Sequence, residues 1–306
     1  MRILTSVAVL GLLVGTPALS AEGWQQEIAS GLGKQGTEMP GGVYRVGLPR
    51  TDLNVTLDGV AIKPALALGS WLAFKPIGNE VMVMGDLVLT QEEINLVLMR
   101  LEQGGVEITA LHNHLLRAEP ATMYMHVHGQ GDPAKLTATL KEALGASKTP
   151  FGAETAGISP QAAEQASTTG SIAQKVDLDT AVLDQTLGHK GKVNGGVYQV
   201  NVRRAEAVKD SGMEVPESMG SAIAINIQPT EPGKAATTGD FVLTANEVNP
   251  VIKALQSNGI EVTAVHNHML NDEPRLFFMH FWANDDTAKV AKGLRAALDQ
   301  VKTAKD

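Results

Sequence analysis

The chain has 306 residues, a formal net charge of −8 and no cysteine. Without cysteine it has no disulfides, thiolate metal ligands or lipid-attachment site, so we expect no membrane anchor in the mature chain. The moderate acidity argues against nucleic acid or an anionic membrane as a partner.

The first 21 residues have the pattern of a secretory signal peptide. Arg2 precedes a short apolar run, which is followed by Pro17 and small residues. A buried N-terminal helix is the alternative, but Gly11, Gly15 and Pro17 disfavour it. The sequence therefore predicts an exported protein, periplasmic in a Gram-negative source and secreted otherwise.

The remainder is a tandem duplication. From Gly85 to Leu144, about 27 of 60 positions are identical to those 154 residues later. A period of this length indicates two whole domains. We predict a first repeat domain over 22–146, a linker rich in Ala, Gly, Ser and Thr over 147–171, with one helical turn around 161–166, and a second repeat domain over 172–306.

Each repeat predicts the same order of elements. In the first repeat these are a strand over 81–89, a helix with apolar residues at 94, 97, 98 and 101, two strands within 106–116 and 122–128, and a helix starting at Asp132–Pro133. Thr90 and Glu93 form a capping-box pattern, as do Thr244 and Glu247. Because Pro250 follows in the second repeat, we expect that helix to begin nearer Asn249. The predicted fold class is α+β, a tandem duplication of a ferredoxin-like β-α-β-β-α sandwich with extra N-terminal strands.

Six of the eight histidines fall in a block that is written twice, ALHNHLLRAEPATMYMH at 110–126 and AVHNHMLNDEPRLFFMH at 264–280. Side chains alternate along a strand, so His112 and His114 share one face. A hairpin that pairs His112 with His126 adds a third imidazole to that face. The same register in the second repeat gathers His266, His268 and His280.

Three imidazoles on one face are typical of a divalent transition-metal site. Zn is the first candidate, with Cu, Fe, Ni or Mn as alternatives. Glu119 and Glu273 become ligands if the hairpin loops fold back. The resulting HxH…E…H set partly resembles that of cupins, but the flanking helices exclude the cupin fold. The competing interpretation is that the histidines are core residues hydrogen-bonded to one another and to backbone.

Other polar residues give weaker signals. His128 becomes Trp282 in the second repeat, so a fourth imidazole is available only in the first. Asn113 and Asn267 point away from the histidine face and are expected to hold a turn or a neighbouring strand. Arg50 with Asp52, and Arg204 with Glu206, are interpreted as surface ion pairs, with an anion clamp at the rim of the site as the alternative. The letters HNH do not predict a nuclease, because nothing basic surrounds them.

The pattern HNHLL-x-x-EP…MH-x-x-G-x-GDP resembles the LppY/LpqO-like family of exported bacterial proteins. The resemblance covers nearly the whole mature chain, including its GGVY and RTD segments. It implies export and a shared architecture, and it implies no reaction. The chain differs from the lipoprotein members in lacking the lipobox cysteine.

Three functions fit the sequence. The first is an exported metal-binding protein, whose partners are the metal ion and a small anionic ligand. The second is a metal-dependent hydrolase or oxidoreductase with an open three-His site, although no catalytic residue can be named. The third is a ligand-binding module without metal. The sequence leaves open whether the two repeats hold separate sites or share one.

Overall fold

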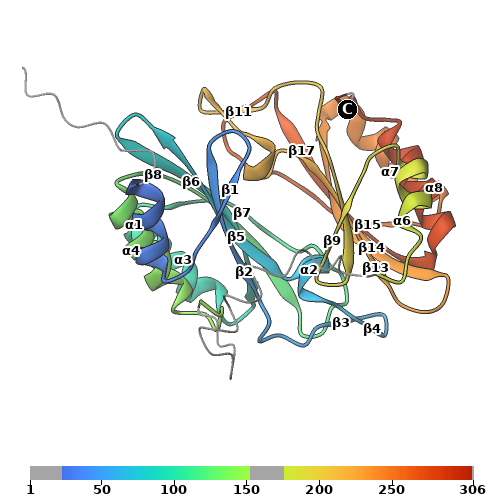
Figure 1. Ribbon diagram of the computed structural model, residues 1–306, viewed down its shortest axis with the longest axis horizontal. Helices are drawn as coiled ribbons and strands as arrows, with labels where there is room; N and C mark the ends of the chain where they lie inside the picture. The colour runs from blue at the N-terminus through green and yellow to red at the C-terminus, as the bar shows by residue number, and fades with distance from the viewer. Residues whose placement is uncertain (1–22, 152–175, 305–306) are drawn as a thin grey trace, which may run out of the picture.

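The computed structural model describes residues 23–151 and 176–304 (Figure 1). The predicted signal peptide and the helical turn expected around 161–166 lie outside these residues. Within them, no helix is both long enough and apolar enough to cross a membrane.

The first repeat is built on a six-stranded antiparallel sheet with the strand order β1-β2-β5-β6-β8-β7. Its strands are β1 Thr37–Met39, β2 Val43–Pro49, β5 Gly69–Ile77, β6 Glu80–Thr90, β7 Glu107–His112 and β8 Thr122–Gly131. Its helices are α1 Gly23–Leu32, α2 Pro64–Ala67, α3 Ile94–Gln103 and α4 Pro133–Leu144. A small hairpin joins β3 Thr56–Leu57 to β4 Val60–Ala61.

The second repeat forms an equivalent sheet with the order β15-β17-β14-β13-β10-β9. Its strands are β9 Lys192–Asn194, β10 Val197–Val202, β13 Ile223–Pro229, β14 Lys234–Thr244, β15 Glu261–His266 and β17 Leu276–Asp286. Its helices are α6 Thr180–Leu187, the 3-10 helix η1 Glu217–Met219, α7 Ala245–Ser257 and α8 Thr287–Leu298. A three-stranded sheet joins β11 Lys209–Asp210, β12 Met213–Glu214 and β16 Asp272–Glu273.

The molecule has four layers, in which the two sheets lie between two outer layers of helices (Figure 1). Helices α1, α3 and α4 cover one sheet, and α6, α7 and α8 cover the other. Strand β6 shows how its side chains produce these layers. Its odd-numbered residues, such as Val83 and Leu87, pack under the helices of the first repeat, whereas Met82 and Met84 pack with the second. Both faces of this strand are therefore buried, and its even-numbered face meets the other repeat.

The observed elements match most of the predicted ones. The fold is mixed α+β with two repeated segments and mostly antiparallel sheets, and the finer ferredoxin-like assignment remains a prediction. Asp132 caps α4 by accepting a hydrogen bond from the backbone amide of Lys135. Helices α1 and α6 were not predicted. Each is short, although Trp24, Ile28 and Leu32 in α1 have the spacing of one helix face.

The expected start of α7 near Asn249 is wrong. The helix begins at Ala245, and Pro250 lies inside it. Thr244 and Glu247 form the complete capping box, which satisfies backbone groups at the helix start. The cap, together with the burial of Val251 and Leu255, outweighs the one intrahelical hydrogen bond that proline cannot donate.

Candidate metal centre

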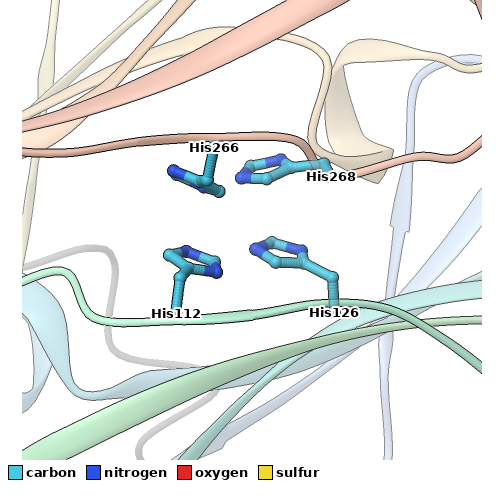
Figure 2. Close-up of side chains that lie close together, drawn as sticks. All are labelled: His112, His126, His266 and His268. Carbon is cyan, nitrogen blue, oxygen red and sulfur yellow. The ribbon is translucent and has the colours of Figure 1, made fainter.

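The six predicted histidines form one cluster between the two sheets. Figure 2 shows His112 and His126 of the first repeat facing His266 and His268 of the second. Three pairs of rings stack across the repeats, with centroid separations of 3.5 Å for His112–His266, 3.6 Å for His114–His280 and 3.7 Å for His126–His268. The two blocks therefore meet at a single place.

Edge strands β7 and β15 bring the blocks together. Asn113 Nδ2 donates to the carbonyl of Thr263 at 3.2 Å, and the Thr263 hydroxyl donates to the carbonyl of His114 at 2.6 Å. The reciprocal bonds run from Asn267 Nδ2 and the Thr109 hydroxyl to the carbonyls of Thr109 and His268. Asn113 and Asn267 thus hold a neighbouring strand, as expected, and that strand belongs to the other repeat.

The predicted register is wrong by two residues. Tyr124 pairs with His112, and Ala110 pairs with His126, with a β-bulge between Ile108 and Ala110. The second repeat pairs Phe278 with His266 and Ala264 with His280. Because the shift is even, the imidazoles keep their common face. The chain leaves β7 after His112 to bond with the other repeat, so His114 lies beyond the strand.

Two acidic residues that the sequence reasoning missed complete the cluster. Asp86 on β6 is paired in register with His126, and Asp240 on β14 is paired with His280. His268 Nε2 lies 3.2 Å from Asp240 Oδ2, and His114 Nε2 lies 3.9 Å from Asp86 Oδ2. The signal that could have found them is the dipeptide Gly-Asp, which both repeats keep in the strand beside the histidine hairpin.

Glu119 and Glu273 lie elsewhere. Glu119 exchanges two backbone hydrogen bonds with Thr56, and Glu273 pairs with Lys209 in the three-stranded sheet. Both side chains are exposed. Backbone pairing holds each loop against its own repeat, so neither glutamate belongs to the cluster.

The cluster concentrates polar atoms that lack partners. Twelve buried side-chain nitrogen and oxygen atoms of the described residues have no hydrogen-bond partner, and ten of them belong to these six histidines and two aspartates. Leaving buried polar atoms unpaired costs about 1–3 kcal/mol each. If these were core histidines hydrogen-bonded to one another and to backbone, as the alternative interpretation has it, these ten atoms would be paired.

Burial sets the protonation of the cluster. It lowers the pKa of all six histidines, and repulsion between neighbouring imidazoles lowers that of His112 and His266 further. Burial also raises the pKa of Asp240 to about 6, and burial and the charge of Asp240 together raise that of Asp86. The imidazoles are therefore neutral at pH 7, which is the form that binds metal.

Backbone carbonyls orient two of the imidazoles. His280 Nδ1 donates to the carbonyl of Gly239 at 2.7 Å, and His268 bonds to the backbone of Gly220. These bonds leave both Nε2 atoms unpartnered. An imidazole held by one nitrogen presents the other to a metal, as is usual for metal-ligating histidines.

The donor atoms gather in four overlapping groups, within each of which all lie within 4.8 Å of one another. Two groups belong to single repeats, and two cross between them. The groups are Asp86, His114 and His126; Asp240, His266, His268 and His280; His112, His126, His266 and His268; and His112, His114 and His280. The described residues could therefore hold metal in several ways, all at this one place.

Comparison with known proteins places both repeats in one family. The family described as Domain of Unknown Function (DUF1259) matches residues 26–146 and 181–300. The chain belongs to the DUF1259 family. Each matched segment contains one histidine block and one of the aspartates Asp86 and Asp240, so the cluster of this DUF1259 protein is built from two copies of the family's domain.

Similarity beyond the family is weak. No curated protein matches the DUF1259 chain. A trimeric bacterial microcompartment shell protein, PduB, is 13% identical over 87% of this chain and 93% of its own, with a TM-score of 0.22. EtuB from Clostridium kluyveri is 8% identical over 87% and 89%, with a TM-score of 0.19. Neither likeness bears on function.

The DUF1259 repeats differ beside the cluster. His128 lies on the same strand face as His126, and its Nδ1 is 3.4 Å from Glu107 Oε2. Trp282, its counterpart, is buried and donates from Nε1 to Asp58 of the first repeat. Neither residue belongs to the four donor groups.

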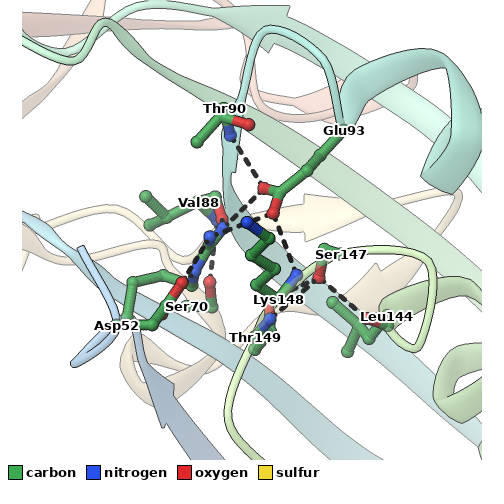
Figure 3. Close-up of polar contacts among 10 residues, drawn as sticks. Asp52, Ser70, Val88, Thr90, Glu93, Leu144, Ser147, Lys148 and Thr149 are labelled. Carbon is green, nitrogen blue, oxygen red and sulfur yellow. Dashed lines mark hydrogen bonds and ion pairs between the residues drawn. The ribbon is translucent and has the colours of Figure 1, made fainter.

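The predicted ion pairs Arg50–Asp52 and Arg204–Glu206 both form in the DUF1259 chain, but their arginines are buried and do not lie on the surface. Arg50 is fully buried and donates from Nε and both Nη atoms to Asp52, Glu93 and the carbonyl of Val88. Figure 3 shows Glu93 at the centre of this network, with Thr90 and Lys148 also bonded to it. The guanidinium thus has all five donors engaged and none left for an anion.

The same network predicts a pH effect on stability. Burial alone would raise the pKa of Glu93, but hydrogen bonds from Arg50, Lys148 and Thr90 outweigh it and hold the pKa below its usual value. A depressed folded-state pKa stabilises the protein above the unfolded-state pKa of about 4.3, and this contribution is lost as the pH falls further. We expect the stability difference between wild type and Glu93→Gln to stay nearly constant from pH 7 to about pH 5 and to shrink as the pH falls below about 4.3, measured by urea unfolding. A difference that grows below about pH 4.3 would contradict this assignment.

Proposed function

We propose that this DUF1259 protein binds divalent transition-metal ions at the one cluster that its two repeats share. The observation that carries the proposal is the convergence of ten unpartnered buried atoms on one place between the sheets. Coordination would satisfy these lone pairs, which the protein leaves unpaired otherwise.

The donor chemistry defines the class of metal. Neutral imidazoles and carboxylates suit Zn, Cu, Ni, Fe and Mn, and the absence of cysteine removes the soft thiolate ligands. Zn remains the first candidate, because it is commonly bound by histidine and aspartate together. The export expected from residues 1–21 is part of the proposal, which places the protein outside the cytoplasm.

A second candidate function is metal-dependent catalysis. It is favoured by the group Asp86, His114 and His126, which offers three donors rather than four. Three protein ligands leave a coordination position for water or substrate, as in catalytic zinc sites. In this case the bound metal would supply the activated water, and the three side chains would hold the ion.

The test removes one donor from every group at once. His126 belongs to two of the four groups and His280 to the other two, so the double variant His126→Ala/His280→Ala affects all four. The matched control is His128→Ala/His189→Ala, which removes two imidazoles outside the groups. Each full-length protein is equilibrated with Zn²⁺, dialysed and analysed for metal, and its fold is checked by circular dichroism.

We expect wild type and the control to retain Zn²⁺ and the His126→Ala/His280→Ala protein to lose most of it. Retention of Zn²⁺ by the double variant at the wild-type level would show that the metal binds outside the cluster. A folded wild type that retains no Zn²⁺, Cu²⁺, Ni²⁺, Fe²⁺ or Mn²⁺ would overturn the proposal and support a ligand-binding module without metal.

A further inference from the structure

The cluster contains more donors than one ion can use. Six imidazoles and two carboxylates face the same place, whereas zinc and related ions take about four protein ligands in structural sites and three in catalytic ones. One ion bound to the group His112, His126, His266 and His268 would leave both aspartates unused. Burying a carboxylate without a cation is unfavourable, so this arrangement leaves unpaired the oxygen atoms that are most costly to bury alone.

Two of the four groups share no residue, and we call them the first and second set. Asp86, His114 and His126 form the first set, and Asp240, His266, His268 and His280 form the second. Each set contains the one aspartate of its repeat, and the duplication relates the first three residues to Asp240, His268 and His280. Each repeat therefore carries a carboxylate-centred set of its own, inside the shared cluster.

We propose that the cluster is a two-metal centre, with one ion on each aspartate and its histidines. This inference rests on the proposed metal-binding function and specifies its stoichiometry. The two sets adjoin, because His126 lies within 4.8 Å of His266 and His268, and His114 lies equally close to His280, by their donor atoms. Two ions held here are neighbours, as in enzymes where metals sit about 3.5–4 Å apart.

The two metal positions, at Asp86 and at Asp240, differ in their expected affinity. The second set has four donors, and the first has three, because His112, the counterpart of His266, is not grouped with Asp86. The positive charge of Arg45 also acts on Asp86, whereas the equivalent position in the second repeat is the neutral Gln199. Fewer donors and a nearby cation both weaken binding at Asp86, so the ion at Asp240 binds first.

The charges of the two ions and the two carboxylates indicate an additional anionic ligand at the first set. Two divalent ions exceed the charge of two carboxylates by two units, and the imidazoles are neutral. Hydroxide or another singly charged anion on the ion at Asp86 offsets one of these two units. The position left open by the three-donor set therefore takes an anion.

The experiment is a titration of metal-stripped, full-length protein with Co²⁺, followed by visible absorption and metal analysis. We expect two equivalents per chain, the second binding at least about tenfold more weakly, since losing even one partner of a metal ligand costs 10–100-fold in affinity. Asp240→Asn should remove the tight equivalent and Asp86→Asn the weak one. Asp132→Asn, which keeps its helix cap, is the matched control and should retain both.

A second measurement does not depend on any variant. Loading wild type with Cu²⁺ should give an isolated electron paramagnetic resonance signal at one equivalent and a broadened, coupled signal at two. One equivalent of Co²⁺ in wild type would overturn the two-metal centre while leaving the proposed function intact, and no binding would overturn both. Two uncoupled Cu²⁺ ions, or two equivalents retained by both aspartate variants, would also overturn it.

Discussion

Zn²⁺ should stabilise this protein strongly against unfolding. A ligand that binds only the folded state adds about 4 kcal/mol to the free energy of unfolding when its free concentration is 1,000 times Kd. Here the expected gain has a structural cause, since the metal engages donors from among the ten buried atoms that have no other partner. Urea unfolding of full-length protein, with Zn²⁺ and with a chelator, measures the difference.

The control for this prediction is the variant His126→Ala/His280→Ala, which lacks a donor from each of the four groups. It should unfold at the same urea concentration with and without Zn²⁺. An equal gain in wild type and variant would show that Zn²⁺ binds at another place, such as exposed carboxylates.

Replacing Arg50 by methionine should destabilise the protein by about 3–5 kcal/mol, the usual cost of leaving a buried charge without its partner. Arg50 is fully buried and holds Glu93 through contacts of 2.8 and 3.1 Å. Its Nη1 also bonds the carbonyl of Val88, two residues from Asp86, so the network helps to fix strand β6 behind the cluster. Chemical denaturation gives the magnitude.

Two further variants test whether the loss of stability in Arg50→Met comes from leaving a buried charge without its partner. Arg100→Met breaks an exposed pair with Glu142 at 3.9 Å and should change stability by less than about 1 kcal/mol. The double variant Arg50→Met/Glu93→Met removes both charges and should be less destabilising than Arg50→Met alone. If Arg50→Met costs no more than Arg100→Met, the buried network does not stabilise the fold.

The duplication explains why the cluster is nearly symmetric without being equal on its two sides. Two identical subunits related by a twofold axis would place the same residues on both sides of such a site. Fusing the two copies into one chain lets each side change separately. Arg45 and Gln199, and likewise His128 and Trp282, are equivalent positions that now differ beside the cluster.

Much of the fold could be predicted from local patterns. The helix stripe at Ile94, Val97 and Leu101 and the cap at Asp132 depend only on neighbours in sequence, and the structure has both. The start of α7 could not be predicted in the same way. Pro250 is locally unfavourable in a helix interior, and only the capping box and the tertiary packing of Val251 and Leu255 make it tolerable.

The sequence by itself determined which histidines belong together, because strand alternation and exact repetition place His112, His126 and their copies on one face. Only the tertiary structure decided that the two blocks form one cluster, that Asp86 and Asp240 belong to it, and that Glu119 and Glu273 do not. The physical reason is that spacing within a strand carries no information on which sheet faces which. That choice depends on burying the inner faces of both sheets against each other.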